Sequence, residues 1–299
     1  MTNLLEMKGV SRRVSSAFSL DGVSLAVGPG EVVGLVGANG AGKTATIRAA
    51  LGLLHADSGS IELFGRPFGA SASGPLARAV LSRVGVVLDT CPFPQDRTVA
   101  QAAACVAPAY PSWDQARFEA LAADSGLSLK ARVADLSRGM GMRLQLAVAL
   151  SHGAELLVLD EATAGLDPIA RDEALDMLRA FASEPGRAAG HAHGVLLSSH
   201  ITTDLERIAD RVVAIDVGRV LFDVARDDIT DRAGIARCSE AQAAEVLGCV
   251  EGARALRREF SFDVLVPDRF EFAEAFPDVP CDHAAVDDYL CFFLKGETR

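Results

Sequence analysis

Continuous apolar runs that end in polar residues recur in the second half of the chain, at Leu156–Asp160, 195–199 and Arg211–Asp216. Such runs are typical of strands buried on both faces of a parallel sheet. Nearer the start, the alternation of apolar residues over 23–27 and the apolar run Val32–Val36 predict two more strands. A glycine-rich turn is expected to join these two strands.

Helical patterns lie between the predicted strands. The Ala-rich segment 44–54 favours a helix after a glycine-rich loop, and 58–67 favours a short strand with a turn. From about Val99 to His152 the chain is rich in Ala and Leu at helical spacing. The simplest fold that holds these elements is an α/β domain with a mainly parallel sheet and an inserted helical subdomain at about 90–155.

The composition changes after residue 222, where we place a domain boundary. Segment 260–266 alternates like a half-buried strand, and 287–296 is predicted to be a closing helix or strand. We therefore expect a small C-terminal α/β extension over 223–299. It holds nine basic and seventeen acidic residues, so it carries −8 of the net charge of −11. This acidic accessory domain is either a solvated surface or a binding surface.

Length and composition limit the class of protein. With 299 residues, 49% of them hydrophobic, the chain can bury a large core, which excludes disorder as its main state. No stretch of about 20 apolar residues and no leader-like start is present, so we expect a soluble chain that is not secreted. The negative charge argues against a general grip on phosphate backbones, so no nucleic-acid partner is expected.

The cysteines and two of the histidines show no metal pattern. The six cysteines form no C-x-x-C pair, and their spacing matches no zinc or haem site. We predict reduced, mostly buried thiols in a reducing cytoplasm. His191 and His193 lie in the glycine-rich segment 183–194 and are predicted to be solvent-exposed.

The segment 37–44, GANGAGKT, fits the phosphate-binding pattern G-x-x-x-x-G-K-[ST] between a predicted strand and a predicted helix. Glycines let successive N–H groups point inward, and the positive end of the helix adds to the anion site. Lys43 would reach the β and γ phosphates, and the Thr44 hydroxyl would hold Mg²⁺. The pattern predicts a P-loop NTPase core. Its predicted nucleotide-binding residues are Gly37, Asn39, Gly40, Ala41, Gly42, Lys43, Thr44 and Thr46.

Two consecutive carboxylates end the apolar run at 156–161, LLVLDE. Because side chains alternate along a strand, the two point in different directions. Asp160 is predicted to lie beside Thr44 as a Mg²⁺ partner. Glu161 is predicted to face the γ-phosphate, where it would act as the base that aligns a water.

Three further segments complete the pattern. Segment 136–140 (LSRGM) precedes the LLVLDE run, segment 165–167 (GLD) comes just after it, and Ser199-His200 ends the next predicted strand. With the two motifs above, they make the chain resemble an ATP-binding cassette (ABC) ATPase over about residues 3–222. The sequences of residues 110–121 and 198–211 are similar to those of nucleotide-binding subunits of exporters whose membrane permease is a separate chain.

The resemblance implies a head-to-tail dimer that holds two ATP, each between the P-loop of one subunit and the LSRGM segment of the other. Asp167 would organise the dimer contact, and His200 would contact the γ-phosphate. The helix that follows Ser137 offers free N–H groups, although an ordinary capped helix start has the same pattern. The segment facing the partner's ATP is predicted to comprise Ser137, Arg138, Gly139 and Met140.

The chain departs from the family pattern at several positions. Asp89 stands where the family commonly has glutamine, and Gln95 follows six residues later. We favour Asp89, which directly ends a predicted strand and would meet Mg²⁺ or its waters. LSRGM lacks one glycine and the glutamine of the LSGGQ-like consensus, and Ala162 replaces a frequent proline. The lysine, both carboxylates and His200 remain, so we expect an active site.

Two aromatic residues have two interpretations each. Val14 holds the common position of the adenine-stacking tyrosine, so Phe18 is the nearest substitute, or else a plain core residue. Phe93, between Pro92 and Pro94, would by resemblance lie near the permease, or else pack locally.

The implied function is ATP hydrolysis that drives a separate permease from the cytoplasmic face of the membrane. The cofactors would be ATP and Mg²⁺. The partners would be an ABC permease and a second ABC ATPase subunit, identical or different. Two alternatives remain, a soluble ABC ATPase that remodels a protein assembly and a nucleotide-sensing regulatory protein.

Overall fold

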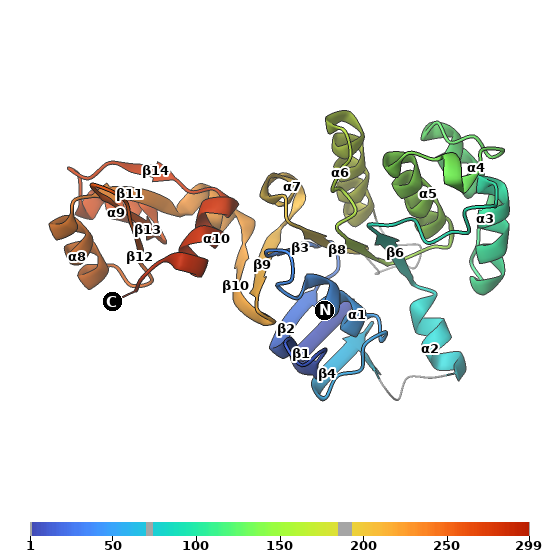
Figure 1. Ribbon diagram of the computed structural model, residues 1–299, viewed down its shortest axis with the longest axis horizontal. Helices are drawn as coiled ribbons and strands as arrows, with labels where there is room; N and C mark the ends of the chain where they lie inside the picture. The colour runs from blue at the N-terminus through green and yellow to red at the C-terminus, as the bar shows by residue number, and fades with distance from the viewer. Residues whose placement is uncertain (1, 70–73, 185–192, 299) are drawn as a thin grey trace.

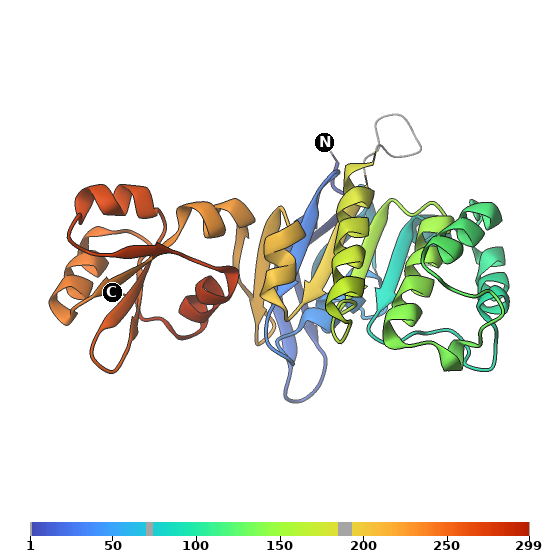
Figure 2. The same cartoon turned by 90° about the horizontal axis from the view of Figure 1, so that it is seen from above.

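The computed structural model describes residues 2–69, 74–184 and 193–298. Figures 1 and 2 show an elongated molecule with a sheet-containing unit in the middle. Helices α3, α4 and α5 lie at one end, and a C-terminal unit around β11–β14 lies at the other. The expected order of core, inserted helices and C-terminal extension is therefore visible in one view.

Within the described residues the strands form three sheets. The central six-stranded sheet has the order β10-β9-β3-β8-β7-β6, and its strands are β10 (Arg219–Ala225), β9 (Arg211–Asp216), β3 (Val32–Val36), β8 (Gly194–Ser199), β7 (Leu156–Asp160) and β6 (Val84–Leu88). A four-stranded antiparallel sheet contains β2 (Ser19–Val27), β1 (Leu5–Arg13), β4 (Ser58–Leu63) and β5 (Arg66–Phe68). The C-terminal sheet contains β12 (Arg254–Arg257), β13 (Phe262–Val266), β11 (Gly234–Cys238) and β14 (Cys281–His283).

Ten α-helices connect or cover the sheets in the described part of the chain. They are α1 (Lys43–Ala50), α2 (Gly74–Leu81), α3 (Val99–Val106), α4 (Gln115–Asp124), α5 (Arg138–Ser151), α6 (Pro168–Ser183), α7 (Thr202–Ile208), α8 (Glu240–Cys249), α9 (Arg269–Ala275) and α10 (Val286–Lys295). Helices α3, α4 and α5 confirm the helical character predicted for 99–152.

The central sheet is parallel except for β10, which pairs antiparallel with β9. Its register aligns the carboxyl ends of neighbouring strands, because Leu88 pairs with Asp160 and Asp160 with Ser198. This confirms the predicted α/β class with a mainly parallel sheet. Ligands of open parallel sheets bind outside this carboxyl edge.

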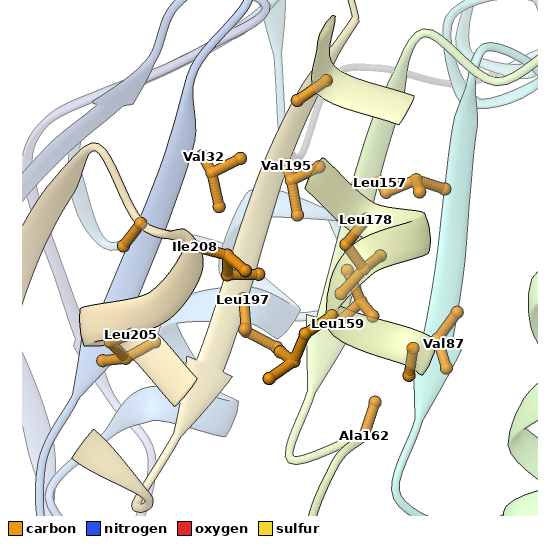
Figure 3. Packing of buried hydrophobic residues seen from close by; sticks show 14 of the residues in the cluster. Val32, Val87, Leu157, Leu159, Ala162, Leu178, Val195, Leu197, Leu205 and Ile208 are labelled. Carbon is orange, nitrogen blue, oxygen red and sulfur yellow. The ribbon is translucent and has the colours of Figure 1, made fainter. Parts of the chain in front are cut away.

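Both faces of the central sheet are buried, which explains the continuous apolar runs. Leu157, Leu159 and Leu197 pack with Leu178 of α6 and Leu205 of α7 (Figure 3). The alternate residues of the same strands pack on the other side, against the β1–β2 sheet and α1. A strand sandwiched in this way needs apolar residues at every position.

Several predicted elements have different bounds or partners. The strands predicted at 23–27 and Val32–Val36 exist, but β2 belongs to the antiparallel sheet and β3 to the central one. Helix α1 ends at Ala50 rather than 54, because Gly52 takes a left-handed φ of 69° that stops the helix. The segment 287–296 forms α10, so of the two alternatives the helix is correct.

The C-terminal unit packs closely on α7 and β10. Phe222 meets the rings of Tyr289 and Phe293 at centroid distances of 5.0 and 4.9 Å, and Val286 N donates to Glu206 Oε1 over 2.7 Å. Strand β10 continues to Ala225, so residue 222 lies inside a strand rather than in a linker.

Two predictions about burial were wrong. Of the six cysteines, all described and all free, only Cys238 is buried, while Cys105 and Cys249 are exposed. His193 is also buried, because it directly precedes β8, stacks on Phe181 and places Nδ1 3.0 Å from the Phe181 carbonyl oxygen. His191 lies outside the described residues. Among those residues, none of the helices has both the length and the apolar character needed to cross a bilayer.

Substitution of Phe222 by Ala should lower the free energy of unfolding by about 3 kcal/mol, since a buried ring between the two units is lost. Thermal unfolding followed by circular dichroism measures the change. Phe260→Ala is the control, because that ring is 97% exposed and should cost less than about 0.5 kcal/mol. Equal effects of the two substitutions would contradict this packing argument.

Stability should also fall in mild acid because of His152. Burial lowers the pKa of His152 to about 4, and its ring stacks on Tyr110. The unfolded chain therefore binds more protons below pH 6.5, and up to about 3 kcal/mol is lost between pH 6.5 and 4. Urea unfolding across this range should show a flatter pH dependence for His152→Asn than for the control His55→Asn, which changes an exposed histidine. An unchanged slope in His152→Asn would refute this assignment.

Candidate functional site

A glycine-rich loop joins β3 to α1 and makes a cradle of backbone groups. A side chain at Gly37 would place its Cβ 2.3 Å from the Ile215 carbonyl oxygen, so only glycine fits there. Gly40 and Gly42 have φ values of 85° and 120°, which other residues rarely adopt. The loop can therefore turn tightly into the N-terminal turn of α1, where an anion is favoured.

Lys43 lies inside this loop rather than in solvent, with only 5% of its side chain exposed. Its Nζ donates to the carbonyl oxygens of Gly37 and Ala38, over 2.7 and 3.3 Å. The same Nζ lies 3.0 Å from Glu161 Oε1. The loop thus fixes one positive charge beside the end of β7.

Glu161 connects Lys43 to His200. Its Oε2 lies 2.6 Å from His200 Nδ1 and accepts a hydrogen bond from His200 N over 3.3 Å. Partial burial raises the pKa of Glu161, but the hydrogen bonds from His200 and Lys43 outweigh burial and leave this pKa below its usual range. Glu161 is thus ionised at neutral pH and can accept a proton.

The backbone of Glu161 is strained, with a φ of 52° that is unusual outside glycine. Ser198 stabilises it, because its Oγ and its carbonyl oxygen accept from Glu161 N over 3.1 and 3.2 Å. Ser198 Oγ also donates to Asp160 Oδ1 over 2.8 Å. Strain of this kind is typical of functional sites, and Ser198 holds both carboxylates in place.

A second supporting residue, Asp204, lies almost fully buried in α7. Its carboxylate accepts from Thr163 Oγ1 over 2.7 Å and pairs with Arg171 of α6. It therefore joins the segment after Glu161 to the helix after His200. Sequence reasoning missed Ser198 and Asp204. The signal that could have indicated Ser198 was its position near the end of an apolar strand. For Asp204 the signal was a charged residue on a helix that packs against the sheet.

A cavity of about 450 Å³ opens beside the cradle, within the usual size range of ligand sites. Thr44 lies on its wall and is exposed, while its predicted contact with Mg²⁺ stays a prediction. Phe18 lines the same cavity and is partly buried against the core, so its place agrees with either expected role and stacking on adenine stays a prediction. The full lining is Val14, Phe18, Ala38, Asn39, Gly40, Gly42, Lys43, Thr44, Ala45, Arg48, Leu54 and Glu161.

Two of the predicted nucleotide-binding residues have structural roles in the loop. Thr46 is fully buried and its hydroxyl donates to the Gly42 carbonyl oxygen over 2.9 Å, so it supports the loop instead of facing the cavity. Ala41 is also buried, and its N–H donates to Ala38 O over 3.1 Å.

The residues present fit a nucleotide with Mg²⁺. The cradle supplies N–H groups and Lys43 for phosphate, and Thr44 offers a hard oxygen ligand in the same cavity. Asp160 offers a carboxylate, but it lines a separate cavity, so its predicted place beside Thr44 stays a prediction. Within the described ranges, no group of three or more His, Cys, Asp or Glu side chains could hold a metal alone.

The LSRGM segment lies outside the lining of this cavity. Ser137 caps α5 by accepting from Met140 N over 3.2 Å, and Gly139 packs near Leu166. Asp167 caps α6 by accepting from two backbone N–H groups. Within one chain these residues are therefore not brought to Lys43.

Asp89 is likewise engaged elsewhere. Its carboxylate forms an ion pair with Arg138 of α5. Gln95, the alternative residue, is exposed and its side chain donates to Phe93 O over 3.3 Å.

Comparison with known proteins identifies the family. The model of the family described as ABC transporter matches residues 20–164. A "Nod factor export ATP-binding protein I" of Burkholderia pseudomallei is 36% identical over 235 residues, which cover 74% of this chain and 70% of the relative. The chain belongs to the ABC transporter family. It is an ABC ATPase, and it binds ATP.

Further comparisons agree with this family. The "Bacitracin transport ATP-binding protein BcrA" of Bacillus licheniformis is 31% identical to this ABC ATPase over 234 residues, covering 78% and 73% of the two chains. A solved ATP binding subunit of an ABC transporter is 30% identical, with a TM-score of 0.65, and covers 76% of this chain and 91% of the other. The cbiO1 structure from Clostridium perfringens, 21% identical with a TM-score of 0.65, shows the fold alone.

Lys43→Ala should weaken ATP binding at least tenfold, because the loop then lacks its charge for the β and γ phosphates. Isothermal titration with a non-hydrolysable ATP analogue measures the affinity. Lys130→Ala is the control, since that lysine is exposed and outside the cavity lining. Unchanged affinity in Lys43→Ala would place the nucleotide elsewhere.

Proposed function

We propose that this ABC ATPase is the nucleotide-binding subunit of an exporter and drives a separate membrane permease from the cytoplasmic face of the membrane. The observation that carries the proposal is the chain of contacts Lys43–Glu161–His200 at the mouth of the P-loop. In this chain of contacts the Glu161 carboxylate bonds a lysine on one side and a histidine on the other, which supports a site for phosphate transfer to water. Names of the relatives, which include Nod factor export and bacitracin transport, support export.

In this proposal each residue has one task in ATP hydrolysis. Lys43 and the N–H groups of the loop bind the phosphates, and Thr44 and Asp160 would hold Mg²⁺, which would supply positive charge to offset that of the phosphates. Glu161 accepts the proton of the attacking water. His200 orients Glu161 and contacts the γ-phosphate.

A head-to-tail dimer would complete the site. Ser137 and Asp167 are exposed at the starts of α5 and α6, away from the cavity of their own chain. Ile169, two residues after Asp167, is 72% exposed although it is large and apolar. A surface that joins exposed polar helix caps with an exposed apolar residue supports contact with a second ABC ATPase subunit.

A second surface supports contact with a permease. Pro92 and Phe93 line a hollow of about 240 Å³ with Val106 and Tyr110. The net charge of −11 disfavours nucleic acid as a partner. A protein with apolar side chains is the better match for this surface.

Glu161→Gln should bind ATP normally but hydrolyse it at least tenfold more slowly, because an amide cannot accept the proton. With ATP and Mg²⁺ this variant should accumulate as a dimer, and light scattering measures its molar mass. Phosphate release gives the rate, and Glu184→Gln, an exposed glutamate, is the control.

Normal turnover in Glu161→Gln would remove this residue from its proposed role. A second substitution, Ser137→Arg, should return the Glu161→Gln dimer to monomers, since it fills the segment proposed to face the partner's nucleotide. A dimer that survives this change would contradict the proposed arrangement.

A further inference from the structure

Helix α5 lies directly beside the end of β6 in space, although the two elements are far apart in the chain. Gln145 of α5 is only 3% exposed and bonds both backbone groups of Leu88. Its Oε1 accepts from Leu88 N over 2.9 Å, and its Nε2 donates to Leu88 O over 3.0 Å. The last residue of β6 is thereby fixed to the middle of α5.

A second contact lies about one turn nearer the start of α5. A Cβ on Gly141 would lie 3.3 Å from Cys91 Cβ, so the helix backbone passes directly beside the segment after β6. Only a residue without a side chain allows this approach without a shift of its neighbour.

A third contact lies at the first residue of α5. Arg138 pairs with Asp89, the residue immediately after β6. The Arg138 guanidinium also passes close to Gly165, where a Cβ would come within 2.7 Å of Nη1. Arg138 thus touches both the segment after β6 and the segment before α6.

The charge of Arg138 is unfavourable where it stands. The N-terminus of a helix carries a partial positive charge, so a cation there is destabilising unless an anion offsets it. In the described part of the chain, Asp89 is the acid with which Arg138 forms an ion pair. The two departures from the family pattern, an acid at 89 and a base at 138, therefore compensate each other.

We propose that Asp89 is a positioning residue and not a Mg²⁺ ligand. Through Arg138 it holds the first turn of α5, and with it Ser137 and Gly139, against the end of β6. Asp89 and Gln145 together keep the start of α5 in a fixed position relative to the carboxyl edge of the central sheet, where Asp160 lies. The effect on turnover rests on the proposed function, whereas the ion pair itself does not.

The first test compares kinetic constants. Asp89→Asn should lower kcat three- to tenfold, while the KM for ATP and the Mg²⁺ concentration for half-maximal rate change less than twofold. The exchanged pair Asp89→Arg with Arg138→Asp restores opposite charges, and it is used only in the hydrogen-exchange measurement because Arg138 belongs to the segment proposed to face the partner's nucleotide. Glu173→Gln is the matched control, because it removes the partner of Arg143 on the same helix.

The second test uses the nucleotide-free chain. Hydrogen exchange of the amides at 138–142 should become at least fivefold faster in Asp89→Asn and return toward the wild-type rate in the exchanged pair. In Glu173→Gln the exchange at 138–142 should stay unchanged. This measurement requires no hydrolysis, so it tests the ion pair even if the proposed function fails.

Either of two results would overturn the proposal. If Asp89→Asn raises the Mg²⁺ requirement and leaves exchange at 138–142 unchanged, Asp89 is a metal ligand. If the exchanged pair does not slow the hydrogen exchange at 138–142 again, the contact with Arg138 does not position α5. A wild-type chain that binds no ATP would instead refute the proposed function and leave the exchange result intact.

Discussion

The carboxylate of Glu161 is the point on which the nucleotide site depends. It lies between a buried lysine from the loop after β3 and a histidine from the loop after β8. These loops meet because the parallel register brings the carboxyl ends of β3, β7 and β8 to one edge. The strained backbone of Glu161 is tolerated there because Ser198 satisfies its N–H group.

The surroundings of Glu161 extend from this edge into the rest of the molecule. Asp204 joins the segment after Glu161 to α7, and α7 in turn packs on α10 of the C-terminal unit. Val286 and Leu290 of α10 share one apolar cluster with Leu205 and Ile208 of α7. The accessory domain is therefore continuous with the packing behind His200 and is not a separate appendage.

Local motifs explain why much of the fold and site could be predicted. The loop around Lys43 and the strand ending in Asp160 and Glu161 each carry their information within a few residues, and their placement beside a parallel strand follows from topology. The four apolar residues that precede Asp160 could be assigned to a strand because a strand buried on both faces is apolar on both sides along most of its length.

Contacts between distant segments could not be predicted in the same way. Arg138 and Asp89 are 49 positions apart, and nothing local to either residue indicates the other. The burial of His193 depends on the ring of Phe181 in another element, so a glycine-rich neighbourhood gave the wrong exposure. Thr46 was assigned to the ligand by its nearness to the motif, but the turn of α1 points its hydroxyl at Gly42.

Strand β6 forms one border of the central sheet, and borders of sheets tend to recruit strands from other molecules. At Leu88 the side-chain amide of Gln145 already bonds the backbone N–H and carbonyl groups with which an added strand would pair. At Leu88 a single side chain of the helical subdomain therefore closes the open edge of β6, where other proteins would need an added strand.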